Sequence, residues 1–291
     1  MARREIGASG LGREQGQGQK QEQKQEQKQE QKQEHIRLEG VGLRYFTPRE
    51  ETEALRGISL SIGRGEFISI VGPSGCGKST LLSLISGMLR PTQGTVTIDG
   101  AEVAGTSDKV GYMLQHDHLF EWRDVLGNVT VGAEIRRMKK EDAKRKGEEL
   151  LKRYGLGDFI HHAPAQLSGG MRQRVALIRT LVAEPDILLL DEPFSALDYQ
   201  TRLTLSEEVF RIIKDQNKTA VLVTHDLSEA ISMGDRVLVM SKRPSTIAAA
   251  HDIVFDEGDN LSPWSKRQAS RYHDYFNTIW KELDDHDVPA L

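Results

Sequence analysis

The most informative segment of the chain is Gly72-Pro73-Ser74-Gly75-Cys76-Gly77-Lys78-Ser79-Thr80. It fits the pattern Gly-x-x-x-x-Gly-Lys-Ser/Thr of phosphate-binding loops. The apolar run at residues 66–71 is typical of a short buried strand, and residues 81–87 have the pattern of a helix that ends at a glycine. A strand, a glycine-rich turn and a helix in this order predict a site for the phosphates of a nucleoside triphosphate, ATP.

Each part of this loop has a task in holding phosphate. The glycines allow backbone N–H groups to turn toward the β-phosphate, and the following helix adds the positive end of its dipole. We expect Lys78 to reach the β- and γ-phosphates and the Ser79 hydroxyl to bind Mg²⁺. Cys76 is the only cysteine, which excludes an internal disulfide. Its place at a helix N-terminus predicts a modifiable thiol whose modification blocks ATP binding.

Composition narrows the classes of function. The chain has 291 residues, a formal net charge of −4 and no block of basic residues, so it shows no electrostatic footprint for nucleic acid. No apolar run approaches the roughly 18 residues that span a bilayer, and the N-terminus lacks the apolar core of a secretory signal. We therefore expect a cytoplasmic protein that reaches a membrane only through partners.

The chain divides into three parts. Residues 1–34 include four copies of Gln-Lys-Gln-Glu at 19–34, with like charges four residues apart and no apolar face. This composition predicts a disordered tail, or a helix that forms only on a partner. Residues 35–254 are predicted to form the nucleotide-binding domain and residues 255–291 a helical extension. The extension has an aromatic face that favours docking on its own domain over a partner or a membrane: Tyr272, Tyr275, Phe276, Ile279, Trp280 and Leu283.

The order of the patterns predicts the fold class. Alternating residues at 36–41, 58–62 and 94–100 indicate strands of an antiparallel patch, with a polar loop at 47–53 between the first two. Charged segments with a thin apolar stripe indicate an inserted helical subdomain at about 122–182. Apolar runs at 187–190, 220–223 and 236–240 alternate with helical segments, as in a mostly parallel sheet. We predict an α/β protein with a P-loop NTPase core, an antiparallel β patch and an inserted helical subdomain.

Two further motifs carry chemistry. The apolar strand at 187–190 ends in Asp191 and Glu192. Asp191 is placed to hold Mg²⁺, directly or through water, and Glu192 is a candidate general base for the attacking water. Ser168, Gly169 and Gly170 open a helix that runs to about residue 182 and form a second anion site. The alternative is that Ser168 only caps this helix.

These motifs stand in the order found in ABC transporter ATP-binding subunits, and residues 36–250 resemble that family. The residues that carry the resemblance are the phosphate loop, Gln115, Leu167-Ser168-Gly169-Gly170, Asp191-Glu192, Ser195-Ala196-Leu197-Asp198 and His225. Met171 departs from the glutamine that the family commonly has after the two glycines, which affects a side-chain contact but not the backbone N–H.

The resemblance implies a role for each site residue. Tyr45 matches the aromatic residue that stacks on adenine, with Phe46 as an adjacent alternative. Gln115 matches the glutamine that touches Mg²⁺ and the attacking water, and His225 the histidine that contacts the γ-phosphate. Two copies of the chain, expected as a homodimer, would face head to tail. Residues 168–170 of one copy would cover the γ-phosphate held by the other, with Ser195 and Asp198 at the dimer contact.

Finer similarities point to the nitrate, sulfonate and taurine importer subunits: residues 118–123, 198–202 and 239–244. They imply two membrane permease subunits, which would dock on the surface after Gln115 that includes Phe120, Glu121 and Trp122. They also imply an extracytoplasmic substrate-binding protein, a peripheral place on the cytoplasmic face of the membrane and a small anionic solute. The alternatives are an importer of another solute, such as a pyrimidine precursor, and a soluble ABC ATPase that acts on nucleic acid or a protein assembly.

Overall fold

The computed structural model describes residues 33–46, 51–258 and 261–287. Nearly all of the predicted tail, residues 1–32, lies outside these ranges, as do residues 47–50 of the predicted polar loop. The rest of that loop was predicted wrongly, because strand β2 (Glu51–Gly63) already includes it. The reason is local: Thr52 and Glu53 pair with β1 (Glu34–Phe46), and Arg44 of β1 forms ion pairs with Glu51 and Glu53.

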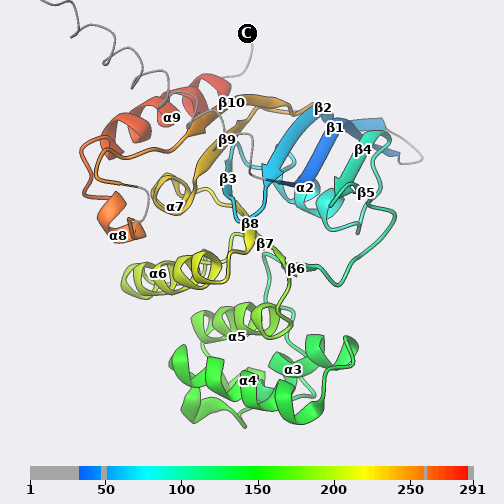
Figure 1. Cartoon of the computed structure of the whole chain (residues 1–291), viewed down its shortest axis with the longest axis vertical. Coiled ribbons are helices and arrows are strands. Elements are labelled where there is room, and N and C mark those ends of the chain that lie inside the picture. The colour runs from blue at the N-terminus through cyan, green and yellow to red at the C-terminus, as the bar shows by residue number, and fades with distance from the viewer. Residues whose placement is uncertain (1–32, 47–50, 259–260, 288–291) are drawn as a thin grey trace, which may run out of the picture.

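A six-stranded sheet forms the centre of the molecule (Figure 1). Its strand order is β10-β9-β3-β8-β7-β6. The bounds are β3 Phe67–Val71, β6 Val110–Met113, β7 Ile187–Asp191, β8 Thr219–Val223, β9 Arg236–Met240 and β10 Ile247–Asp252. All pairs are parallel except the edge pair β10–β9. Every residue of β3, β7 and β8 is buried, which explains why these strands are mostly apolar.

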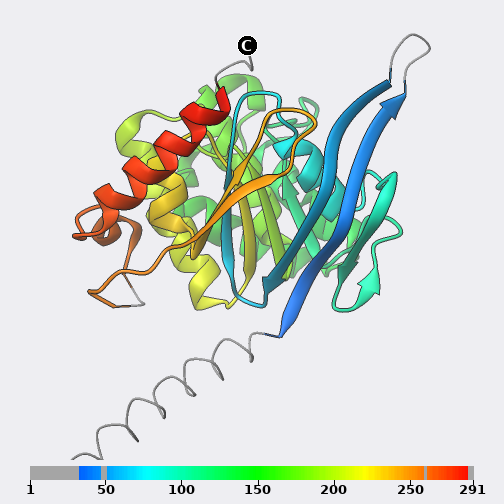
Figure 2. The same ribbon diagram turned by 90° about the horizontal axis from the view of Figure 1, so that it is seen from above.

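A second sheet is antiparallel throughout, in the order β2-β1-β4-β5, with β4 at Gln93–Ile98 and β5 at Ala101–Glu102. Helix α2 (Lys78–Ile85) shares one hydrophobic core with this sheet and with the face of the central sheet that turns toward it. Figure 2 shows the long β1–β2 ribbon lying along one side of the molecule. The predicted α/β class with an antiparallel patch is confirmed.

Three helices lie together below the central sheet in Figure 1: α3 (Val125–Ile135), α4 (Lys140–Arg153) and α5 (Gly169–Val182). They occupy the segment predicted to be a helical insertion. Their apolar faces join the core under β6, β7 and β8 through buried residues such as Val129, Leu151 and Ile178. Two single-turn 3-10 helices, Gly157–Phe159 and Pro164–Gln166, connect α4 to α5.

The last four helices are α6 (Tyr199–Asp215), α7 (Leu227–Met233), α8 (Pro263–Lys266) and α9 (Tyr272–Asp287). Helix α6 shares the hydrophobic core of α3, α4 and α5, while α7 and α9 form a separate core with β9. The aromatic face of α9 docks on α7 and β9, as predicted, and Tyr272 and Ile279 are buried there. Trp280 is an exception, because 59% of it is exposed and its ring stacks on Phe276.

Lys266 is a buried cation under this extension. Its Nζ donates to the carbonyl oxygen of Gly234 over 3.3 Å and lies 5.0 Å from the centre of the Phe210 ring. The nearby Asp235 is held by Lys214, whose Nζ lies 2.6 Å from its carboxylate. Burial therefore lowers the pKa of Lys266 to about 8.

We predict that Lys266→Met increases the free energy of unfolding by about 1–2 kcal/mol at pH 7, because it removes a poorly paired buried charge. In the wild type, the unfolded chain binds the proton more tightly, so its stability rises between pH 8 and the ordinary lysine pKa of 10.5. The advantage of the variant should shrink over that range. Urea denaturation at pH 7 and 9.5 measures both effects, with Lys214→Met as a control that should be destabilised. A less stable Lys266→Met protein at pH 7 would contradict this prediction.

Candidate functional site

The phosphate loop joins β3 to α2, as predicted, and its backbone depends on glycine at two positions. Gly75 has φ of 71° and Gly77 has φ of 121°, both in the region that side chains disfavour. A Cβ atom at Gly77 would lie 2.9 Å from Cδ2 of Leu55. No side chain caps the N-terminus of α2, whose residues are all described, so its first N–H groups remain available to an anion.

Lys78 is folded over this loop. Its Nζ donates to the carbonyl oxygens of Gly72 over 2.7 Å and Pro73 over 2.9 Å. Only 8% of the residue is exposed. The loop thus holds a buried ammonium group above its own amides, which is an arrangement suited to a multiply charged anion. Cys76 is also buried, with only 2% of the residue exposed, so the prediction of a readily modified thiol is wrong.

A buried acid lies beside the loop at the end of β7. Burial, and then the charge of Glu192, raises the pKa of Asp191. The hydroxyl of Tyr112 on β6 donates to Oδ2 of Asp191 over 3.4 Å and lies at the same distance from the carbonyl oxygen of Ser79. Burial raises the pKa of Tyr112 to about 12, so it stays a neutral donor. The sequence analysis missed Tyr112, because an aromatic residue inside a strand gives no functional signal.

Two of the predicted residues, Gln115 and His225, contact the same carboxylate oxygen of Glu192. Nε2 of Gln115 donates to Oε2 of Glu192 over 3.2 Å, and Nδ1 of His225 lies 3.4 Å from the same oxygen. Glu192 itself has φ of 48°, an uncommon conformation for a residue other than glycine. Residues that are far apart in the sequence therefore meet at the carboxyl ends of parallel strands.

These groups surround a cavity of about 570 Å³. Its lining residues are Gly72, Ser74, Gly75, Gly77, Lys78, Ser79, Thr80, Gln115, Glu192, His225 and Arg243. All except Arg243 were predicted. Arg243 follows β9 and its Nε donates to the carbonyl oxygen of Gly75, a contact that the sequence alone does not signal.

Other predicted residues lie at the rim or elsewhere. Tyr45 is at the rim, with its hydroxyl 3.3 Å from Oγ1 of Thr80, while Phe46 is 70% exposed. Ser168 caps α5 by accepting from the N–H of Met171, and Asp198 caps α6 by accepting from the N–H of Thr201. The remaining three predicted residues, Gly169, Gly170 and Ser195, are absent from the cavity lining, as are Ser168 and Asp198. The described part of one chain therefore brings together only part of the predicted site.

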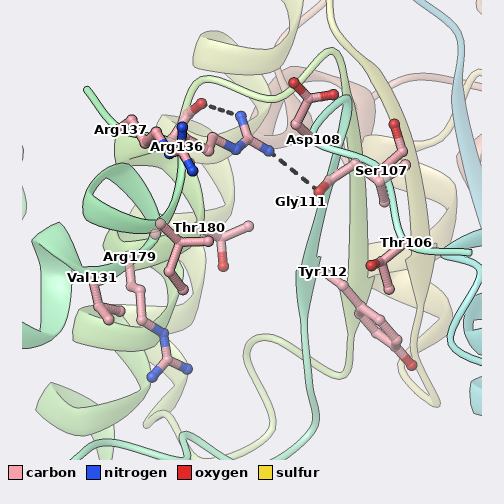
Figure 3. Close-up of a pocket in the computed structure, with 14 residues that line it drawn as sticks. Thr106, Ser107, Asp108, Gly111, Tyr112, Val131, Arg136, Arg137, Arg179 and Thr180 are labelled. Carbon is pink, nitrogen blue, oxygen red and sulfur yellow. Dashed lines mark hydrogen bonds between the residues drawn. The ribbon is translucent and has the colours of Figure 1, made fainter.

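A second cavity of about 550 Å³ lies between β6, the end of α3 and α5 (Figure 3). Arg136, Arg137 and Arg179 line it, together with Tyr112 and several hydroxyl side chains. Arg136 is engaged there, since it donates to the carbonyl oxygens of Ala183 and Val110. Arg179 donates to the carbonyl oxygens of Asp117 and His118. A residue that lines this cavity therefore also contacts the segment that follows Gln115.

Comparison with known proteins shows the family to which the chain belongs. The family model described as ABC transporter matches residues 55–195. The chain is 46% identical over 249 residues to the ABC transporter ATP-binding protein YtlC of Bacillus subtilis, an uncharacterized protein, covering 86% of this chain and 95% of that one. It is 40% identical over 225 residues to the taurine import ATP-binding protein TauB of Jannaschia sp., covering 77% and 84%.

The chain belongs to the ABC transporter ATP-binding proteins. A solved dimeric structure of the ATP-binding cassette MJ0796 bound to ADP and Pi is 34% identical, with a TM-score of 0.69, and covers 75% of this chain and 99% of that one. This chain is an ABC ATPase, which hydrolyses ATP to drive transport. None of the helices in the described ranges has both the length and the apolar character of a membrane span.

The residues present also fit Mg²⁺ together with ATP. No group of three or more His, Cys, Asp or Glu side chains in the described residues forms a metal cage. Mg²⁺ rarely needs one, because one or two carboxylates plus substrate phosphates complete its shell. Asp191, which ends β7 beside the phosphate loop, is suited to supply that carboxylate.

We predict that Gly77→Ala lowers ATP affinity at least tenfold and destabilises the fold by about 1–3 kcal/mol, because a side chain there is strained and meets Leu55. Gly75→Ala is the matched control. Its φ is also positive, but its nearest new contact is 3.5 Å away, on the flexible Arg243. Titration with a fluorescent ATP analogue and thermal unfolding measure the two effects. Equal losses in both variants would contradict the steric explanation.

Proposed function

We propose that this chain is the ATP-hydrolysing subunit of an importer for a small anionic solute such as a sulfonate, taurine or nitrate. The observation that carries the solute class is the similarity to taurine import ATP-binding proteins, 38–42% identical over 204–254 residues. The chain covers at least four fifths of each of these relatives. The ATPase subunit itself does not bind the solute, so this assignment rests on similarity and on the partners that it implies.

In the proposed mechanism, the loop at 72–80 holds the phosphates and Tyr45 stacks on adenine. Mg²⁺ would be held by Ser79, Gln115 and Asp191, where it neutralises charge on the phosphates. Glu192 accepts the proton of the attacking water, and its carboxylate is oriented for this by the Gln115 amide. His225, whose Nδ1 lies 3.4 Å from the Glu192 oxygen that accepts from Gln115, donates to the γ-phosphate.

The site is completed by a second copy of the chain. Residues 168–170 would supply their open helix N-terminus to the γ-phosphate held by the other copy, and Ser195 and Asp198 would lie at the contact. Two features support this arrangement. Gly169 has open space around it, and Ser195 and Asp198 are exposed in the single chain. The dimeric MJ0796 cassette gives a precedent for such a pair.

The proposed surface for the permease subunits follows Gln115. Phe120 and Trp122 pack ring against ring at 4.9 Å, and 79% of Trp122 is exposed. Arg172 holds this segment by ion pairs to Asp117 and Glu121, and the cavity of Figure 3 adjoins it through Arg179. An exposed aromatic pair on a firmly held segment is suited to a protein contact. This contact would place the chain on the cytoplasmic face of the membrane, opposite an extracytoplasmic binding protein.

Uptake measurements test the proposal. A strain of the source organism that lacks this chain should lose uptake of labelled sulfonate, taurine or nitrate, and the wild-type gene should restore it. A Lys78→Ala version should not restore it, because it cannot hold the phosphates. The chain should also purify from membranes with two permease subunits. Loss of uptake of a pyrimidine precursor alone would overturn the solute class. Purification with nucleic acid and without permeases would overturn the transporter assignment.

A further inference from the structure

Glu229 is a buried acid that none of the roles above uses. It lies on α7, four residues after His225, and only 3% of the residue is exposed. A buried carboxylate is costly unless charged or hydrogen-bonding groups compensate it. The groups that contact the Glu229 carboxylate therefore indicate its role.

One oxygen of Glu229 binds the strand end that carries His225. Oγ1 of Thr224 donates to Oε2 of Glu229 over 2.6 Å, and the same hydroxyl accepts from the N–H of Asp226 over 3.0 Å. Thr224 and Asp226 are the two neighbours of His225 in the chain. Glu229 thus fixes the backbone on both sides of the histidine, while the His225 side chain remains exposed to the nucleotide cavity.

The other oxygen faces Arg202 of α6. Nε of Arg202 lies 3.7 Å from Oε1 of Glu229, and Nη1 donates to the Asp226 carboxylate over 3.1 Å. Nη2 donates to the carbonyl oxygen of Leu197 over 3.2 Å. Leu197 lies between Ser195 and Asp198, in the segment expected to meet the second chain. The planar guanidinium group of Arg202 therefore contacts both the segment at 195–198 and Asp226, the residue after His225.

We propose that Glu229 and Arg202 are positioning residues that couple the segment at 195–198 to His225. When a second chain docks on residues 195–198, the carbonyl oxygen of Leu197 shifts. The guanidinium group of Arg202 moves with it, and this movement displaces Asp226 and Glu229. His225 of the same chain then takes its place at the γ-phosphate. The inference rests on the proposed two-chain site and on the proposed role of His225. It identifies Arg202 and Glu229 as the residues through which docking of the second chain affects the position of His225.

The charges around Glu229 make this coupling sensitive to pH. Burial raises the pKa of Glu229 to about 7, while Arg202 and His225 favour its ionised form and Asp226 opposes it. From the C-terminal extension packed on α7, Tyr272 faces Ser228 and Asp226, and Arg267 lies near Tyr272. Protonation below about pH 7 removes the charge that attracts Arg202. The coupling should therefore weaken as pH falls through 7.

The test uses the full-length chain and two variants. Glu229→Gln keeps the size of the side chain and an acceptor for Thr224 but loses the charge, and Arg202→Lys keeps the charge but loses the fork. We expect the Hill coefficient for ATP hydrolysis to fall from near 2 toward 1 and kcat to fall about tenfold at pH 8. Affinity of the single chain for a fluorescent ATP analogue should change less than twofold. The Hill coefficient of the wild type should fall between pH 8 and 6, and that of Glu229→Gln should stay low and flat.

Glu66→Gln is the matched control, because it breaks the similarly sheltered ion pair between Glu66 and Arg236 at the far end of β3. It should leave the Hill coefficient unchanged. Unchanged cooperativity in both network variants would overturn the coupling while leaving the proposed function intact. A parallel loss of nucleotide affinity and thermal stability would also overturn it, in favour of a purely structural role. A wild-type chain without any cooperativity would instead contradict the two-chain site itself.

Discussion

The junction of β3 with α2 is the constraint on which the rest of the structure depends. The loop between them has φ of 121° at Gly77, a conformation that side chains rarely adopt, and a Cβ atom there would press on Leu55 of the antiparallel sheet. Its helix packs between the two sheets, and its strand lies at the centre of the larger one. Because β7 and β8 run parallel to β3, their carboxyl ends open on the same edge. Lys78, Asp191 and His225 reach one site for this reason.

All the groups that line this site lie at one edge of the central sheet. The helix start at Ser168 is on α5, which packs under β6 and β7 through the core of the helical part. Within the described residues it contributes nothing to the cavity lining. A single chain can therefore hold phosphate but brings together only part of the predicted site. In the proposed function, each ATP site needs residues from two chains. Bound ATP therefore stabilises the dimer, and ATP hydrolysis allows the two chains to separate.

The sequence allowed most of the sheet and the site to be predicted, because both depend on local patterns. Apolar strands that end in Asp191-Glu192 or precede His225 are visible as runs, and the phosphate loop has a fixed spacing. Tyr112 and Arg243 were not predictable, since each reaches the site only through the pairing of strands far apart in the sequence. The reactive Cys76 was predicted from its helix terminus alone, and burial overrides that argument. The network of Glu229 also needed the structure, because its partner Arg202 belongs to another helix.

Trapping the dimer shows whether Glu192 is the base in an ATP site shared by two chains. The measurement is size-exclusion chromatography with light scattering on Glu192→Gln in ATP and Mg²⁺, together with its rate of ATP hydrolysis. If Glu192 is this base, we expect retained ATP binding, turnover reduced by about 10²-fold or more, and a stable dimer that dissociates when ATP is removed. Turnover at the wild-type rate, or a variant that stays monomeric with bound ATP, would contradict it.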